Sequence, residues 1–211
     1  MIGGVPAIGV CSEPTAVLGR RRHLIALLLF IAPIVVACGD RAEASSKSTA
    51  AHTATPSLEA GLAQFRRDLP VAVELRGGET SREALVRRFL TAVARNDTND
   101  VRAMLMSRSE FAYLYYPTSP FATRQQAGLW WFLNIENSRT GITRAFARLA
   151  AQPLRYVGHE CAASVPDGKS FTHDHCQVTF AVGRDTTTLR LFGSILEHGG
   201  RYKFMGYGND F

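Results

Sequence analysis

The chain lacks the short motifs by which several large enzyme classes are recognised. Its 211 residues contain no Gly-x-Ser-x-Gly turn, no Walker phosphate-binding loop, no His-Glu-x-x-His and no dinucleotide-binding glycine fingerprint. Each motif exists because its chemistry needs certain residues at a fixed spacing. Their absence counts against those classes and favours a binding protein over an enzyme. We expect neither catalytic residues nor a cofactor.

Long hydrophobic runs are also missing near the N-terminus. The apolar stretch over residues 24–36 is roughly 13 residues long, whereas a membrane-spanning helix needs roughly 20. Three basic residues precede it, Arg20, Arg21 and Arg22, and small residues lead out of it into Cys38. A basic flank, a short apolar core and a small-residue exit are typical of a cleaved export signal. An uncleaved N-terminal anchor is the alternative.

The segment Val35-Val36-Ala37-Cys38 resembles the lipobox that ends a bacterial lipoprotein signal peptide. The resemblance implies that residues 1–37 are a signal peptide and that Cys38 carries lipid as the first mature residue. A lipid anchor holds a protein on a membrane without a spanning helix. We therefore expect a lipoprotein of the cell envelope that faces the periplasm or the cell exterior.

Large apolar residues are absent from positions 39–56, which read GDRAEASSKSTAAHTATP. A segment of this composition has no large apolar surface whose burial could offset the entropy cost of ordering the chain. The sequence thus predicts that residues 38–56 form the lipidated cysteine and a flexible tether, and that residues 57–211 form a single domain.

A strong excess of one charge is missing too. The net charge is +6, and it falls to about +4 once residues 1–37, with three Arg and one Glu, are removed. Without a clustered basic stripe or a nucleic-acid motif, nucleic acid is not an expected partner. The remaining charge suits weak attraction to anionic lipid headgroups, or simply solubility.

The domain shows helical spacing first and alternating spacing afterwards. Apolar periodicity predicts a first helix over 57–69, and a second that begins at a Thr80–Glu83 capping box and ends at Arg95. A short third helix follows the turn at 96–100. Two more helices are predicted over 123–137 and 142–149, and Pro153 ends the last of them. Residues 111–116 read as a strand or a short irregular segment. Alternation then predicts strands over 154–162, 172–183, 187–197 and 201–209. We expect an α+β fold, with N-terminal helices followed by a four-stranded antiparallel meander.

This order of elements, with the capping box and the Asn-Asp turn at 96–100, resembles the NTF2-like (SnoaL-like) superfamily over about residues 80–211. The resemblance implies a sheet curled into a cone around the helices. The early hairpin of that superfamily is at best reduced to residues 110–116 here. The superfamily holds both enzymes and non-catalytic modules, so the fold alone does not decide the function.

Cysteine is scarce, with four residues in the chain. Cys11 would leave with the signal and Cys38 would carry lipid, so Cys161 and Cys176 remain as a pair in an oxidising compartment. We expect them to form a disulfide between neighbouring strands. The alternative is a metal site built from His159, Cys161, His173, His175 and Cys176. Strand alternation disfavours it, because pairing Cys161 with Cys176 puts His173 and His175 on the opposite face.

Strand alternation also turns His159 and Asp174 toward the face of Cys176 and Val178. Enzymes of the NTF2-like superfamily often place an acid or base inside the cone, so the resemblance makes His159 the first candidate and Asp174 the second. Tyr113 and Trp131 belong to an aromatic set that could line the same pocket, or could be core.

Three functions follow from these features. The leading hypothesis is a non-catalytic, lipid-anchored domain that binds a small apolar or carbohydrate ligand or an envelope protein. The alternative is an NTF2-like isomerase or hydrolase that uses His159 as its acid or base. A purely structural envelope component is the third.

The lipobox yields a direct prediction. Growth of the expressing bacterium with a radiolabelled fatty acid should label the wild-type protein, because the acyl chains are attached at Cys38, and should leave the Cys38→Ser variant unlabelled. Equal labelling of the two proteins, read from a denaturing gel, would refute the assignment.

Overall fold

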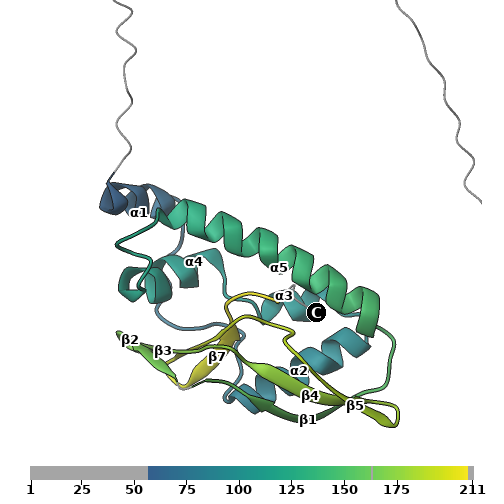
Figure 1. The fold of residues 1–211 in the computed structure, drawn as a ribbon. Coiled ribbons are helices and arrows are strands. Elements are labelled where there is room, and N and C mark those ends of the chain that lie inside the picture. Colours follow the sequence, from purple (N-terminus) through teal and green to yellow (C-terminus); the bar gives the residue numbers. More distant parts are fainter. Residues whose placement is uncertain (1–56, 163, 209–211) are drawn as a thin grey trace, which may run out of the picture. The chain divides into compact units, whose positions relative to one another are not determined.

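The computed structural model of the protein describes residues 57–162 and 164–208 (Figure 1). The predicted signal peptide 1–37, Cys38 and the tether 39–56 lie outside the described residues. Within the described part, no helix has both the length and the apolar character needed to cross a bilayer. This part is a mixed α+β domain, as the order of sequence patterns predicted.

Serine hydroxyls start the first two helices. Ser57 caps α1 (Leu58–Arg66) and Ser81 caps α2 (Arg82–Ala94); each hydroxyl accepts a hydrogen bond from a backbone amide in the first turn, at 3.1 and 3.0 Å. The cap therefore lies one residue after Thr80, and the expected capping box does not form, because Ala84 takes the third helical position. Glu83 instead binds Arg87 one turn further along α2, at 2.7 Å.

The Asn-Asp turn starts a short helix as predicted. Asp97 accepts hydrogen bonds from the amides of Asn99 and Asp100, at 3.1 and 2.9 Å, and so caps α3 (Thr98–Ala103). The capping carboxylate satisfies amides that no helical carbonyl can reach.

The aromatic run at 111–116 is helical rather than extended. Ser107 and Glu110 form a capping box that starts α4 (Arg108–Glu110), and the chain continues through a π-helical turn, η1 (Phe111–Tyr115), into a 3₁₀ turn, η2 (Tyr116–Thr118). The aromatic composition favoured a strand. The capping box in front of the run, and the burial of the run on several sides, favour the helix instead.

A single helix, α5 (Ala127–Leu149), replaces the two that the sequence predicted over 123–137 and 142–149. Gly141 lies inside it and does not break it. A Cβ at this position would overlap the carbonyl oxygen of Gly208, so the glycine lets the C-terminal strand region pass directly under the helix.

The described strands form two antiparallel sheets, in place of the expected four-stranded meander. One has the order β1-β4-β5 and the other the order β2-β3-β6-β7. Their bounds are β1 (Leu154–Glu160), β2 (Val165–Asp167), β3 (Ser170–His173), β4 (Gln177–Val182), β5 (Asp185–Leu189), β6 (Ile195–His198) and β7 (Arg201–Phe204).

Two of the predicted strands are interrupted, and each interruption moves the chain from one sheet to the other. The stretch 172–183 breaks between β3 and β4, where His175 has a left-handed backbone with φ of 52°. The stretch 187–197 breaks over residues 190–194, between β5 and β6. The sequence analysis predicted each stretch as one continuous strand, because the alternation on either side of each break is that of a strand.

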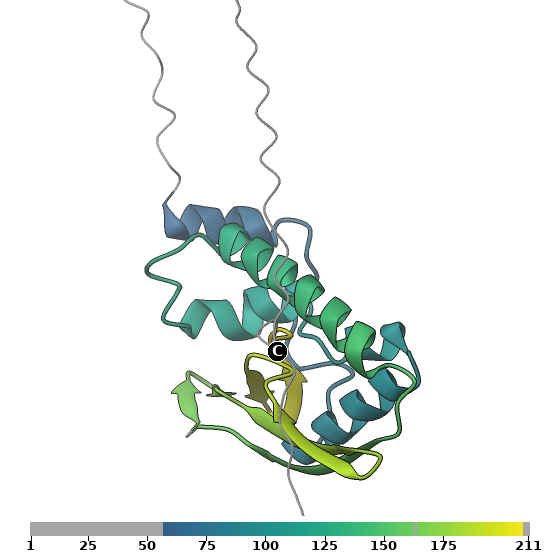
Figure 2. The ribbon, with the colours of Figure 1, turned by 45° about the vertical axis from the view of Figure 1, so that its right-hand side comes forward.

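Helices and strands occupy opposite sides of the domain. Figures 1 and 2 show α1 and α5 side by side on one side, the strands on the other, and the shorter helices between them. Phe89 of α2 lies at the centre of the larger core cluster, where its ring meets those of Phe192, Phe204 and Tyr207 at 5.3–6.3 Å. A second cluster lies under the start of α5, around Phe111.

A buried ion pair joins the helical side to the sheet. Glu110 and Lys203 lie 2.9 Å apart, and both side chains are only 4% exposed. Glu110 also accepts hydrogen bonds from the amides of Arg76 and Ser107, while the Lys203 ammonium donates to the Arg76 carbonyl. A buried charge is tolerated when it is paired and its other hydrogen-bonding positions are filled, and both conditions hold here.

This pair predicts a large loss of stability on removal of one partner. Glu110→Gln should lower the free energy of unfolding by about 3–5 kcal/mol, because it leaves the Lys203 charge buried without a counter-charge. Glu74→Gln is the matched control, since Glu74 pairs with Arg76 at the surface, where such pairs contribute about 0–1 kcal/mol. Urea denaturation measures the free energy of unfolding of both variants. Equal losses in the two variants would contradict the burial of the Glu110–Lys203 pair.

Candidate functional site

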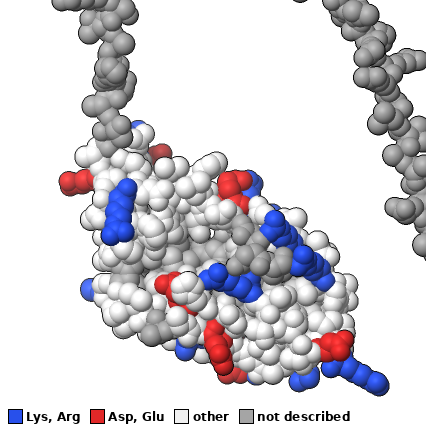
Figure 3. Space-filling model, in the orientation of Figure 1, with Lys and Arg blue, Asp and Glu red and all other residues white. Residues whose placement is uncertain are grey.

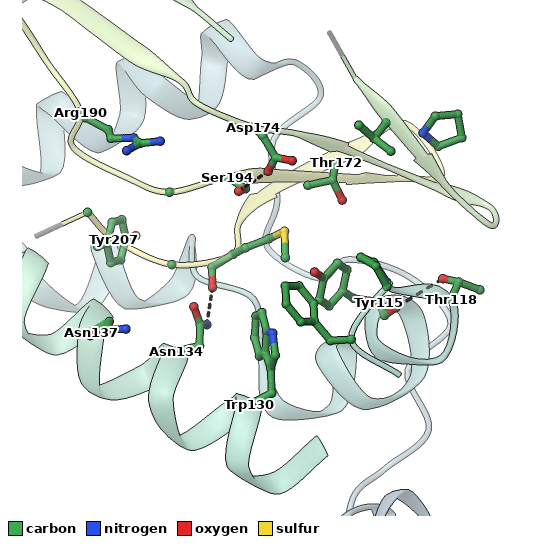
Figure 4. Close-up of a pocket in the computed structure, with 18 residues that line it drawn as sticks. Tyr115, Thr118, Trp130, Asn134, Asn137, Thr172, Asp174, Arg190, Ser194 and Tyr207 are labelled. Carbon is green, nitrogen blue, oxygen red and sulfur yellow. Dashed lines mark hydrogen bonds between the residues drawn. The ribbon is translucent and has the colours of Figure 1, made fainter. Parts of the chain in front are cut away.

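A pocket of about 720 Å³ lies between α5 and the segments that connect the two sheets. Figure 4 shows most of the labelled residues in two groups, one from α5 and the η turns and the other from β3, the residue after it and the loop before β6. Tyr207, from the segment after β7, lies between the two groups. Pockets of this size hold ligands in the range of a sugar or a drug-sized molecule.

One wall of the pocket is aromatic. Trp130 lies between Tyr115 and Phe121, with ring centres 5.6 Å from each. Tyr115 ends the π-helical turn η1, a local widening of a helix that occurs frequently at functional sites. The rings offer flat apolar faces against which a planar or cyclic ligand can stack.

The opposite wall is polar. Asp174 accepts a hydrogen bond from the hydroxyl of Ser194, and Thr172 and Arg190 lie on the same side (Figure 4). Arg190 donates to Nδ1 of His175 at 2.7 Å. His175, next to Asp174, has a left-handed backbone. At this turn the chain passes from one sheet to the other, and the turn brings the Asp174 carboxylate to the pocket.

The inner end of the pocket is closed by contacts between α5 and the segment after β7. Asn134 donates to the carbonyl of Met205 at 2.7 Å, and Ser138 accepts from the Tyr207 amide at 3.2 Å. The Tyr207 hydroxyl donates to the Val101 carbonyl at 2.6 Å, and burial raises the pKa of this phenol well above its usual value. Tyr207 is therefore a fixed, neutral part of the wall.

Tyr207 also borders a second pocket of about 600 Å³, which lies between α3 and α5 and contains Ile142 and Phe146. The guanidinium groups of Arg102 and Arg139 border it, whereas the first pocket combines an aromatic wall with a carboxylate, a guanidinium and two asparagines. The first pocket therefore offers more groups that can orient a polar ligand.

The disulfide predicted from the cysteine pair is confirmed. Cys161 and Cys176 are bonded, and their positions continue the β1–β4 register in which Glu160 faces Gln177. The amide of Ala162 donates to the Asp174 carbonyl at 2.9 Å, so the bridge sits directly beside the Asp174 segment. With both sulfurs bonded, the thiolates of the alternative metal site are not available, and the described residues contain no group of three or more ligand side chains fit to hold a metal.

The four candidate pocket residues lie in three different places. Asp174 lines the pocket. Trp131 packs in the second core cluster, with its ring 5.3 Å from Phe111, and Tyr113 lies under the Arg66 guanidinium at 4.5 Å. His159 is hydrogen-bonded through Nδ1 to the Tyr156 hydroxyl at 2.7 Å, close to the start of α2.

The surroundings of His159 favour its neutral form and lower its pKa. Burial is the main cause that lowers the pKa of the imidazole, and the nearby Arg82 charge adds to it. His159 faces Val178 across the β1–β4 pair, as strand alternation predicted. Asp174 does not share its surroundings, because the turn at His175 interrupts the alternation between Asp174 and β4.

Several groups of the site were not predicted from the sequence. Asn134 follows Trp130 by one helical turn, so helical spacing could have placed the two together. Ser194 and Arg190 carry no such signal, because the loop between β5 and β6 reads as part of a strand.

Comparison of the chain with protein-family models, with curated proteins and with solved structures finds no match to any of them. The geometry of the site therefore carries the functional argument.

The environment of His159 predicts a pH dependence of stability. Because the folded state holds the pKa of this histidine below its unfolded value, the unfolded state binds the extra proton more readily. The stability contribution is thus present above the unfolded pKa, about 6.5, and is lost as the pH falls below it.

The measurement compares wild type with His159→Gln by urea denaturation between pH 8 and pH 5. We expect the free energy of unfolding of the wild type to fall more steeply toward acid than that of the variant. Parallel pH profiles would contradict the burial of a neutral His159.

Proposed function

We propose that the protein is a lipid-anchored domain of the cell envelope that binds a small cyclic ligand in the pocket between α5 and the sheets. The observation that carries the proposal is the pairing of an aromatic wall, at Trp130, with a polar wall, at Asp174, across one pocket. An aromatic face holds the apolar side of a ring by stacking, and the polar groups hold hydroxyl or amide substituents. Sugars and hydroxylated aromatic rings have this chemistry.

Binding without catalysis agrees with the groups in the pocket. Among the described residues that line it there is no histidine or cysteine, and the Asp174 carboxylate is already engaged by Ser194. His159, the residue of the enzyme alternative, has Tyr156 and the start of α2 as its surroundings instead. The proposal therefore gives His159 no acid–base role.

The proposal includes an NTF2-like arrangement of the domain. It is supported by the order of elements, with a helix pair, a long helix and then antiparallel strands, and by the packing of α2 against β1 and β7. The division of the strands into two sheets departs from a single curled meander.

The cell-envelope location rests on the lipobox at Cys38, and the disulfide agrees with it. Disulfides persist in oxidising compartments such as the bacterial periplasm and are rare in the cytosol.

Ligand binding is tested by calorimetry and thermal shift with a panel of mono- and disaccharides and hydroxylated aromatic compounds. For a compound that binds, Trp130→Ala and Asp174→Asn should each raise Kd by about tenfold, which corresponds to the loss of about 1.4 kcal/mol.

Leu129→Ala is the control for this test. Leu129 neighbours Trp130 in sequence but is half exposed on the outer side of α5. It should leave Kd unchanged. A panel without a single saturable binder, or equal effects of all three substitutions, would count against the pocket as the binding site.

A further inference from the structure

The outer face of α5 carries an exposed apolar ridge. Leu129, Phe132 and Leu133 are 50%, 59% and 45% exposed. Their spacing of three and four residues puts them on one face of the helix. We call these three residues the α5 ridge. Large apolar side chains that gather in this way mark a surface meant for contact, whereas single ones are ordinary.

The half of α5 that carries the ridge has no charge. Residues 127–135 contain no acidic or basic side chain, and the charged residues begin with Glu136 and Arg139 and continue with the exposed Arg144 and Arg148. Figure 3 shows this change, with an uncharged surface over the first half of the helix and charged groups further along it. The helix thus has an apolar half followed by a mainly basic half.

The chain enters the domain next to this ridge. α1 lies along the start of α5: a Cβ on Gly128 would meet the Phe65 ring at 3.7 Å, and a Cβ on Gly61 would collide with the Gln126 side chain. Residues 38–56 lead into Ser57, the cap of α1. Even fully extended, the chain from Cys38 to Ser57 spans at most about 65 Å. A lipid on Cys38 would therefore keep the domain within this distance of the bilayer, with the tether joined to the domain at α1, beside the start of α5.

We propose that the α5 ridge inserts into the headgroup region of the membrane that carries the Cys38 lipid. The inference rests on the anchoring part of the proposed function. Apolar side chains of an interfacial helix enter the boundary between headgroups and acyl chains, and basic residues beside them attract anionic headgroups. Here the α5 ridge supplies the apolar side chains, and Arg144 and Arg148 supply the basic residues.

A second copy of the chain is a poorer occupant for the α5 ridge. A stable protein interface uses about 20–30 residues on each side, whereas the ridge has three large apolar residues. The inner side of the same helical segment lines the pocket through Trp130 and Asn134. Membrane contact would thus place the ligand pocket one helix diameter from the bilayer.

The test uses the full-length lipidated protein in vesicles of phosphatidylethanolamine and phosphatidylglycerol. A nitrobenzoxadiazole probe is attached to a Leu129→Cys variant, and the vesicles are prepared with and without bromine on the lipid acyl chains. Bromine quenches a probe that it can approach, so we expect emission at position 129 to fall about twofold or more in brominated vesicles. The same probe on Thr186→Cys, at an exposed position of β5 on the opposite side, should not be quenched.

Three double variants separate the effect of the α5 ridge from that of general surface hydrophobicity. Phe132→Ser with Leu133→Ser should abolish the quenching at position 129. Val157→Ser with Phe171→Ser, which removes two apolar side chains exposed by 50% and 41% on the strands, should retain it. Phe132→Leu with Leu133→Phe keeps the apolar surface and should also retain it. Circular dichroism melts check that each variant is folded.

The outcomes distinguish this inference from the proposed function. Chains that float with the vesicles but show no quenching, or equal quenching at positions 129 and 186, overturn the membrane contact and leave the anchor intact. Chains that do not float overturn both the anchor and the membrane contact, while the ligand titration still tests the pocket. If the Cys38→Ser protein dimerises, and adding Phe132→Ser with Leu133→Ser abolishes the dimer, then the α5 ridge contacts a second copy of the chain. That result would overturn the inference.

Discussion

The buried ion pair between Glu110 and Lys203 is the constraint on which the arrangement of this domain depends. Each residue stands directly before a segment that lines the pocket. Glu110 precedes the π-helical turn that carries Tyr115, and Lys203 lies in β7, just before Met205 and Gly206. The backbone of Arg76 binds both partners, so the pair also holds the loop between α1 and α2. One charge pair thus ties the turn that carries Tyr115 to the strand that leads into the inner end of the pocket.

α5 takes part in both the proposed ligand site and the proposed membrane contact, and its two faces have different chemistry. Its inner face packs so closely on the segment after β7 that Gly141 and Gly206 leave no room for a Cβ. The pocket side chains Trp130 and Asn134 project from a helix that is fixed by these contacts. Its outer face is open, apolar in the first half and mainly basic in the second. A rigid helix of this kind connects the proposed membrane contact to the proposed ligand site without any moving part.

The disulfide and the turn at His175 act together on the polar wall. The Cys161–Cys176 bond holds β1 beside the start of β4, and the turn between Asp174 and Cys176 moves the chain from one sheet to the other. Asp174 therefore leaves the face that strand alternation assigned to it and meets Ser194. The separation of His159 from Asp174, which the sequence placed on a common face, has the same cause.

Much of this protein could be predicted from local patterns, because local patterns report local physics. The helix starts near Ser57 and Asp97, the change from helical to alternating periodicity after Pro153, the α+β class and the disulfide all follow from neighbouring residues or from a count of cysteines. The helical form of the aromatic run at 111–116, the unbroken α5 and the exchange of strands between two sheets do not. They depend on contacts between residues far apart in the chain, such as Gly141 with Gly208 and Glu110 with Lys203. The sequence by itself determined the α+β class, several of the helix starts and the pairing of Cys161 with Cys176. Only the tertiary structure decided which side chains share a pocket, because that depends on where the chain changes sheets and on which buried charges must meet.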